Sequence, residues 1–434
     1  MEYKGVVKNV LDGAGADVGD YIEVTREKDS FKGIVMPHVE FSGKDILTLK
    51  LDNGYNIGVK VDKLCKVQLV QEREEGRRVE AEYVADTSKP IVSILGTGGT
   101  IASYVEYRTG AVFPAEKAKD LVFTVPELAD ICNVRAKVIY SMFSENMTSE
   151  NWKVLASEAA AELDSGSRGV VIPHGTDTLG YTAAALSFML DDLNGPVILV
   201  GSQRSSDRPS SDAFLNLTSS ARLAKEDLGE VVVVMHGETS DSLCTIHRGT
   251  KVRKMHSSRR DAFMSVNQKP LGSVHQDGQT EWLDDHRSRS SGPVKLQAEM
   301  EDGVVLVYFY PGMPATLFKS MVKDARGVVI AGTGLGHVSS SLFPEIESLM
   351  EAGTPVVMTT QCLYGRVNMN VYSAGRDLLL AGVIPGEDML PETAFIKLMW
   401  VLGQTSDMEE ARELMTTNLR GEINPAIKLE EYSE

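Results

Sequence analysis

The part of the chain after about residue 90 is a succession of short, continuous apolar runs. The first five are IVSIL (91–95), AKVIYS (136–141), GVVI (169–172), PVILV (196–200) and VVVVM (231–235). Runs of this kind are typical of strands buried on both faces of a parallel sheet. Between the second and third runs, apolar residues recur at helical spacing over 152–163, and Gly166 follows as a stop signal. The alternation predicts an α/β architecture.

A second set of runs begins near residue 303. It consists of VVLVYFY (304–310), VVIA (328–331) and PVVMT (355–359), each followed by a helix-like segment. We therefore expect a second, smaller α/β domain. The length of 434 residues agrees with two or three domains, because it is too long for one core.

The first 85 residues have a different pattern. The runs YIEVTR, FKGIVMP, DILTLKL and NIGVKV alternate and are separated by turn residues, which predicts a small β-barrel. The charge-rich stretch 71–86 is typical of a linker. We expect three domains: a small β-barrel at 1–85, a larger α/β domain at 86–300 and a smaller α/β domain at 301–434.

Charge and cysteine usage limit the classes of partner. The formal net charge is −17 and the pI is near 5.0, so nucleic acid would need a local basic patch or a partner chain. Four widely spaced cysteines encode neither a disulfide framework nor a zinc site. The first residues lack the apolar segment of a signal peptide, and no stretch approaches the ~20 apolar residues of a membrane span. We expect a cytoplasmic chain without a metal site.

A glycine-rich loop, GTGGTI (96–101), follows the first apolar run. A dinucleotide fingerprint requires glycine in place of Ile101, and no Gly-Lys-Ser/Thr follows for a phosphate loop. The loop offers instead a hydroxyl on a tight strand-to-helix turn, where glycines let the backbone approach a small substrate. A plain glycine turn is the alternative.

A second polar loop, HGTDT (174–178), follows the run GVVI. Taken alone, Asp177 could be only the N-cap of the helix predicted over 182–190. Parallel strands, however, place ligands at their carboxyl ends, and two polar loops at such ends favour a common site.

The motifs TGGTIA (97–102) and HGTDT (174–178) resemble the two signatures of the threonine-dependent asparaginase/glutaminase family. The resemblance covers roughly residues 90 to 420, and it implies a larger N-terminal α/β domain followed by a smaller C-terminal one. Free-standing asparaginases lack a β domain before this body. A small β domain followed by an asparaginase-like body resembles the domain arrangement of the D-subunit family of archaeal glutamyl-tRNA(Gln) amidotransferases.

The second resemblance implies a ligase component that hydrolyses L-glutamine, or L-asparagine, to release ammonia. The ammonia would pass to a partner, the E subunit, which holds tRNA(Gln) and converts Glu-tRNA(Gln) to Gln-tRNA(Gln). ATP and Mg²⁺ are expected at that partner, no cofactor is expected in this chain, and a homodimer within a heterotetramer is the expected assembly. A free-standing cytosolic L-asparaginase and a non-catalytic amino-acid-binding module are the alternatives.

Amide hydrolysis needs a nucleophile, a proton acceptor and donors for the oxyanion. By motif position, the resemblance implies Thr97 as the nucleophile. It adds three residues that move or hold the proton: Thr176, Asp177 and Lys254. Lys254 fits because DAF (261–263) follows it as in the family, and neighbouring cations would make it a better base than an ordinary lysine. The alternative is that it is one charge in a solvated loop.

The residues implied for substrate contacts are Gly98, Gly175, Ser144 and Glu145. Glu145 stands where asparaginases often carry glutamine. The family's mobile tyrosine has no match at its expected place, so Tyr104 or Tyr107 would substitute for it, or lid closure would depend on something else. The segment 247–260 holds eight His, Lys or Arg residues, which are either ordinary surface charge or a dock for tRNA or an acidic face of the partner.

Overall fold

The computed structural model describes residues 3–26, 29–36, 43–50, 56–62, 64–72, 86–98, 103–106, 111–114, 127–204 and 211–426. The N-terminal domain contains α1 (Gly5–Ala14), β1 (Tyr21–Arg26), β2 (Asp29–Val35), β3 (Ile46–Lys50), β4 (Asn56–Lys60) and β5 (Lys66–Gln71). The strands pair in the order β4-β3-β2-β1-β5, and Ile22 and Leu47 form a core with Val7 of α1. The predicted β domain is confirmed, and α1 and β5 are additional to the four predicted strands. Most of the predicted linker, 73–85, lies outside the described residues.

The main sheet has eight strands in the order β18-β17-β14-β13-β12-β10-β6-β9. They are β6 (Ile91–Gly96), β9 (Asn133–Val138), β10 (Val170–Pro173), β12 (Val197–Val200), β13 (Val231–His236), β14 (Leu243–Arg248), β17 (Gly272–His275) and β18 (Thr280–Trp282). The first five are parallel, as their apolar runs predict. The sheet as a whole is mixed, because β14, β17 and β18, which lie outside the predicted runs, extend it in the antiparallel sense.

Helices cover both faces of the parallel strands. They are α3 (Leu128–Ile131), α4 (Ser149–Asp164), α5 (Leu179–Met189) and α6 (Ala213–Leu223). Val170 packs in one core with α4 and α5, whereas Val171 packs in another with α3 and α6. Successive strand residues point to opposite faces, which explains why β10 is apolar throughout.

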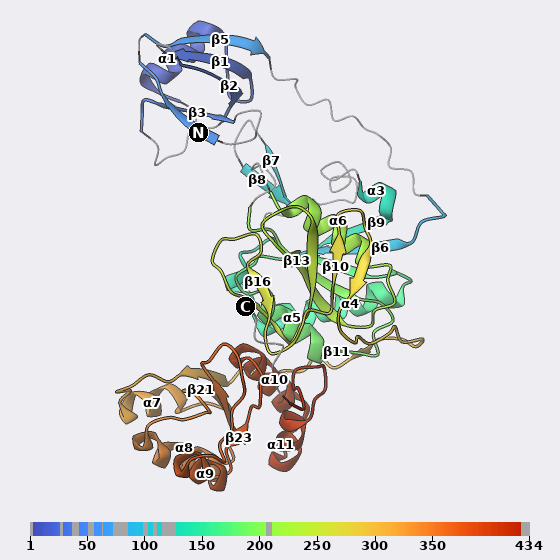
Figure 1. The fold of residues 1–434 in the computed structure, drawn as a ribbon, viewed down its shortest axis with the longest axis vertical. Coiled ribbons are helices and arrows are strands. Elements are labelled where there is room, and N and C mark those ends of the chain that lie inside the picture. Colours follow the sequence, from blue (N-terminus) through green and yellow to red (C-terminus); the bar gives the residue numbers. More distant parts are fainter. Residues whose placement is uncertain are drawn as a thin grey trace.

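The C-terminal domain has a four-stranded parallel sheet in the order β20-β21-β22-β23. Its elements are β20 (Val304–Tyr308), α7 (Ala315–Val322), β21 (Gly327–Gly332), α8 (Phe343–Glu351), β22 (Val356–Thr360), α9 (Ser373–Leu380), β23 (Ile384–Pro385), α10 (Pro391–Gln404) and α11 (Met408–Thr416). Helix α10 packs against α5 of the main domain (Figure 1). The rings of Phe188 and Trp400 stack at this contact, with centroids 5.9 Å apart. One apolar core therefore continues from the main domain into the C-terminal domain.

Among the described residues, three two-stranded sheets lie outside the larger ones. They pair β7 (Ser103–Glu106) with β8 (Ala111–Pro114), β11 (Leu190–Asp191) with β19 (Lys295–Leu296), and β15 (Val252–Lys254) with β16 (Phe263–Ser265). Two 3-10 helices complete the described elements, η1 (Ser144–Asn146) and η2 (Ser340–Leu342). The predicted strand-to-helix turn after β6 is wrong, because the next described segments pair as strands β7 and β8. No helix in the described ranges is long and apolar enough to cross a membrane.

Candidate active site

The two polar loops predicted from the sequence meet at one edge of the main sheet. Strands β6, β10, β12 and β13 are parallel neighbours, with β10 between β6 and β12, so their carboxyl ends lie at the same edge. Thr97 directly follows β6, and His174 directly follows β10. The β15–β16 hairpin reaches this edge too, because Lys254 at the end of β15 contacts the loop after β10.

Lys254 joins the hairpin to the second polar loop. Its Nζ donates to Thr176 Oγ1 at 2.9 Å and to Asp177 Oδ1 at 2.8 Å. The Lys254 side chain is 14% exposed and the Asp177 side chain is 72% exposed, so the carboxylate stays accessible to a ligand. Thr178, not Asp177, is the N-cap residue of α5, so helix capping does not account for Asp177. The structure thus brings together three of the four residues predicted to be catalytic.

His174 supports the same loop and was not among the predicted site residues. The Gly175 carbonyl beside His174 Nδ1 can only accept, so the proton of the neutral ring is on Nδ1 and Nε2 accepts from the Thr182 hydroxyl at 3.0 Å; Thr182 Oγ1 itself accepts from Trp152 Nε1 at 2.9 Å. The Nδ1–H donates to the Gly175 carbonyl at 2.7 Å. Burial lowers the pKa of His174 to about 4, so a neutral ring holds the backbone just before Thr176. Its place at the start of the HGTDT motif was the signal for this residue.

Thr97 has a different setting from the one its predicted role requires. Its side chain is 1% exposed, and its hydroxyl donates to the Pro173 carbonyl at 2.9 Å. Its backbone N–H donates to the same carbonyl at 3.3 Å, and its own carbonyl accepts from the Met142 N–H. Thr97 therefore ties the end of β6 to the end of β10, and its hydroxyl is not presented to a substrate.

The loop glycines are required by close packing. Gly98 has φ +106°, and a Cβ there would lie 2.5 Å from the Met142 carbonyl oxygen. A Cβ on Gly175 would lie 2.8 Å from the Cβ of Ser144. Ser144, in η1, is buried and its carbonyl accepts from the Thr178 hydroxyl at 2.6 Å, whereas Glu145 is exposed. The segment around Ser144 is thus held against both polar loops.

The basic segment 247–260 is not an unpaired basic surface. Each of its lysines and arginines forms an ion pair: Arg248 with Glu230, Lys251 with Asp388, Arg253 with Glu392, Lys254 with Asp177, Arg259 with Asp261 and Arg260 with Asp241. His247 is buried, and burial lowers its pKa to about 3. The predicted dock for tRNA gains no support, and simple solvated charge is wrong for most of the segment. The cations predicted to act on Lys254 are likewise compensated by carboxylates.

Part of the predicted site falls outside the described residues. This applies to Tyr107 and to residues 99–102 of the glycine loop. The backbone of Tyr104 lies in β7 opposite Phe113 of β8, and the identity of the lid tyrosine stays a prediction. In the part of the chain that the structure describes, no group of three or more His, Cys, Asp or Glu side chains is placed to hold a metal ion.

The two-domain α/β body, with a hydroxyl, an amine and a carboxylate in contact at its carboxyl edge, has the architecture of the asparaginase-like proteins. Residues 91–287 match the family model "Asparaginase, N-terminal", residues 303–415 match "Glutaminase/Asparaginase C-terminal domain" and residues 16–70 match "GatD N-terminal domain". The solved L-asparaginase of Thermococcus kodakarensis is similar with a TM-score of 0.70 and 33% identity, over 77% of this chain and 100% of that chain.

Curated relatives extend the similarity to the N-terminal domain. The D subunit of the glutamyl-tRNA(Gln) amidotransferase of Pyrococcus furiosus is 53% identical over 97% of this chain and 98% of its own length. The D subunit from Methanothermobacter thermautotrophicus is 47% identical over 98% of both chains. The chain belongs to the family of glutamyl-tRNA(Gln) amidotransferase D subunits. Both resemblances predicted from the sequence, and the asparaginase-like fold, are confirmed.

Proposed function

We propose that this chain hydrolyses the side-chain amide of L-glutamine, or of L-asparagine, to supply ammonia to a partner chain. The partner would convert Glu-tRNA(Gln) to Gln-tRNA(Gln). The observation that carries the proposal is the bridge from Lys254 to Thr176 and Asp177, at 2.9 and 2.8 Å, in a chain of the D-subunit family. The same atoms suit amide hydrolysis, because a hydroxyl and an amine in contact can pass a proton.

Each member of the bridge has a proposed role. In its neutral amine form, Lys254 accepts a proton from the Thr176 hydroxyl, which takes up the nucleophile's proton in exchange; the lysine then returns the proton along the same path to the departing ammonia. Asp177 holds the lysine with one oxygen, and its exposure leaves the carboxylate accessible to the α-ammonium group of an amino-acid substrate. Gly98, Gly175 and Ser144 shape the adjoining backbone, and Glu145 is exposed beside them as a further contact for the substrate.

The nucleophile is proposed to come from the glycine loop. The sequence assigns it to Thr97, but that hydroxyl is buried and donates to the Pro173 carbonyl, which argues against it. The loop has one other hydroxyl, that of Thr100, which lies outside the described residues. We assign the attack on the amide carbon to Thr100 and give Thr97 the task of fixing the base of the loop.

The assembly follows the family. We propose the E subunit of the amidotransferase as the partner, with tRNA(Gln) bound mainly by that partner and ATP and Mg²⁺ used at its site, and a homodimer of this chain within a heterotetramer. This chain is proposed to need no cofactor or metal and to work in the cytoplasm. The proposed division is a β domain at 1–85, an asparaginase-like domain at 86–300 and a smaller one at 301–434. A free-standing L-asparaginase is the second candidate, favoured by the similarity of the main body to the solved asparaginase.

The test measures ammonia release from glutamine and from asparagine, with the chain alone and with the E subunit and Glu-tRNA(Gln). Faster release from glutamine in the complex is expected, and release from neither amide under any condition would refute the proposal. Asparagine turnover at the same rate with and without the partner and tRNA would instead support the second candidate. Thr100→Val should lower turnover by about 10³-fold or more, and Thr97→Val should lower it less. The reverse order would return the nucleophile to Thr97.

A further inference from the structure

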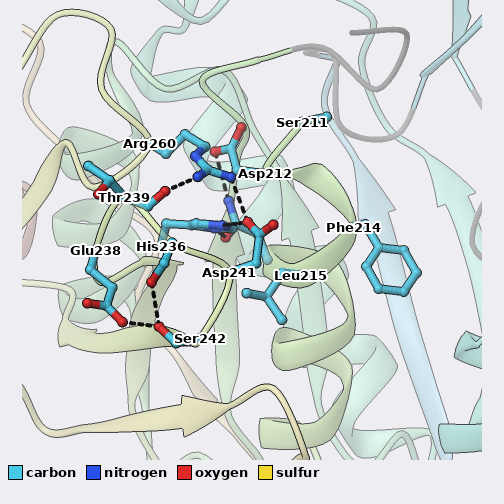
Figure 2. Close-up of polar contacts among 12 residues, drawn as sticks. Ser211, Asp212, Phe214, Leu215, His236, Glu238, Thr239, Asp241, Ser242 and Arg260 are labelled. Atoms are coloured by element: carbon cyan, nitrogen blue, oxygen red, sulfur yellow. Dashed lines mark hydrogen bonds and ion pairs between the residues drawn. The ribbon is translucent and has the colours of Figure 1, made fainter. Parts of the chain in front are cut away.

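A second polar cluster lies beside the candidate site, and none of its members belongs to the predicted catalytic set. We call His236, Asp241 and Arg260 the tip clamp. Arg260 Nη1 donates to Asp241 Oδ1 at 2.6 Å, and its other terminal nitrogen donates to the Thr239 carbonyl. His236 Nε2 lies 3.1 Å from the same Asp241 oxygen. Figure 2 shows Arg260 and His236 converging on Asp241.

The tip clamp is anchored in the main domain by Asn216 of α6. The Asn216 amide donates to the Gly201 carbonyl at 2.9 Å and to Asp212 at 3.1 Å, which fixes its orientation. Its oxygen therefore faces His236 Nδ1 at 2.6 Å as an acceptor. Both ring nitrogens of the buried His236 thus lie within hydrogen-bond distance of an oxygen, one of Asn216 and one of Asp241.

Asp241 is the residue of the tip clamp that both His236 and Arg260 contact. The hydrogen bond from His236 holds the pKa of the Asp241 carboxyl below its usual value, and the Arg260 charge acts in the same direction against partial burial. The carboxylate is therefore ionised at neutral pH, and it accepts from the Arg260 guanidinium and from His236. Such charge-assisted hydrogen bonds are stronger than neutral ones.

The tip clamp acts on the turn of the β15–β16 hairpin. Its strands are three residues long, and it forms a separate sheet of two strands. Val252 and Phe263 bury the strands of the hairpin in the main core, so the position of its turn is what further contacts can set. Lys254 ends β15, and the turn after it is closed by the hydrogen bond from the Met255 N–H to the Ala262 carbonyl at 2.6 Å. Arg260 lies within this turn, and its contacts with Thr239 and Asp241 attach the turn to the loop after β13.

We propose that Asp241 and Arg260 are positioning residues: the tip clamp fixes the β15–β16 hairpin so that the Lys254 amine stays in contact with Thr176. His236 supports the clamp through Asp241. The inference rests on the proposed function, because Lys254 matters for turnover only if the chain is an amidohydrolase. A misplaced amine lowers the rate of proton transfer while the substrate pocket persists, so the loss is expected in kcat rather than in KM.

The test uses the full-length chain under the conditions in which the wild type releases ammonia. Arg260→Ala should lower kcat by about tenfold or more with KM within about twofold. Millimolar methylguanidinium should restore part of that kcat, because the cation can occupy the space of the lost guanidinium and bind Asp241. Asp241→Asn should lower kcat similarly without rescue, and combining it with Arg260→Ala should cost little more than either change alone.

Arg259→Ala is the matched control. Arg259 is the neighbour of Arg260 in the same turn, but it pairs only locally with Asp261 and is 54% exposed. Its removal should leave kcat unchanged. A kcat loss in Arg259→Ala equal to that in Arg260→Ala, a rise in KM alone, or a loss that methylguanidinium does not restore would overturn the inference. If Arg260→Ala fails to fold, Asp241→Asn decides, and wild-type kcat in that variant overturns the inference. Absence of turnover in the wild type would refute the proposed function instead.

Discussion

Lys251 and Lys254 lie three residues apart, yet they belong to two regions of the molecule with different physical character. Lys251 is completely buried where the main domain meets the C-terminal domain, and its Nζ lies 2.5 Å from Asp388. Burial lowers the pKa of the Lys251 ammonium, and Asp388 opposes that effect. Lys254 is partly exposed and bridges Thr176 and Asp177 at the sheet edge.

The two pairs differ in whether the carboxylate has all its hydrogen bonds from within the protein or remains free to bind a ligand. Asp388 also accepts from the Asn424 backbone N–H at 2.9 Å and from its side-chain amide at 2.8 Å. Asp177, at 72% exposed, keeps capacity for a ligand. We call Lys251–Asp388 the closed pair and Lys254–Asp177 the open pair. The closed pair joins the two domains, whereas the open pair can act on a substrate. The same residue types in one segment therefore serve structure and chemistry, and accessibility separates the two uses.

The largest expected effect is on turnover at the open pair. Lys254→Met keeps most of the side-chain volume and removes the amine, so the proposed proton acceptor is lost. We expect kcat for amide hydrolysis to fall by about 10³-fold. The urea midpoint should move little, because the pair has an exposed carboxylate and such pairs contribute about 0–1 kcal/mol. Retained turnover in a folded Lys254→Met protein would remove Lys254 from the mechanism.

The second effect is on stability at the closed pair. Lys251→Met leaves Asp388 charged, buried and without its cation, which should cost about 3–5 kcal/mol in the free energy of unfolding. Asp388→Asn in the same chain removes the stranded charge and retains an acceptor for Asn424, so it should recover part of the loss. Urea unfolding followed by tryptophan fluorescence measures both. Equal stability of Lys251→Met and wild type would mean that the domain contact does not depend on this pair.

The sequence predicted the features that depend on short runs or motifs of neighbouring residues. Continuous apolar runs identify the five parallel strands, and the motif HGTDT with the later DAF identifies Thr176, Asp177 and Lys254. It did not predict the antiparallel strands β17 and β18, because they are short and carry few apolar residues.

Long-range partners explain the remaining differences. Lys251 lies in the segment predicted to be either surface charge or a dock, and its actual role was not predicted because its partner Asp388 is 137 residues away. Thr97 looked like an open hydroxyl because its acceptor, the Pro173 carbonyl, belongs to a strand 76 residues further along the chain. Residue type shows that a group can act, and the partners that decide how it acts are set by the fold.

The smallest expected effect concerns the support of the open pair. His174 is neutral in the folded chain with a pKa of about 4, against an ordinary value of 6.5. The folded-state pKa is lowered, so its contribution to stability is present above pH 6.5 and is lost progressively as the pH falls to about 4. Between pH 7 and pH 5 this loss is about 2 kcal/mol. His174→Gln cannot be protonated in this range and should lack the loss.

The measurement compares urea unfolding of wild type and His174→Gln at pH 7 and pH 5. His247, also buried with a lowered pKa, is present in both proteins, so the difference between their pH dependences isolates His174. We expect the gap in unfolding free energy between the two proteins to change by about 2 kcal/mol in favour of the variant on acidification. A gap that stays constant would mean that His174 takes up its proton without leaving the network. The Gly175 backbone would then not depend on a neutral ring, and the open pair would be held by its own contacts alone.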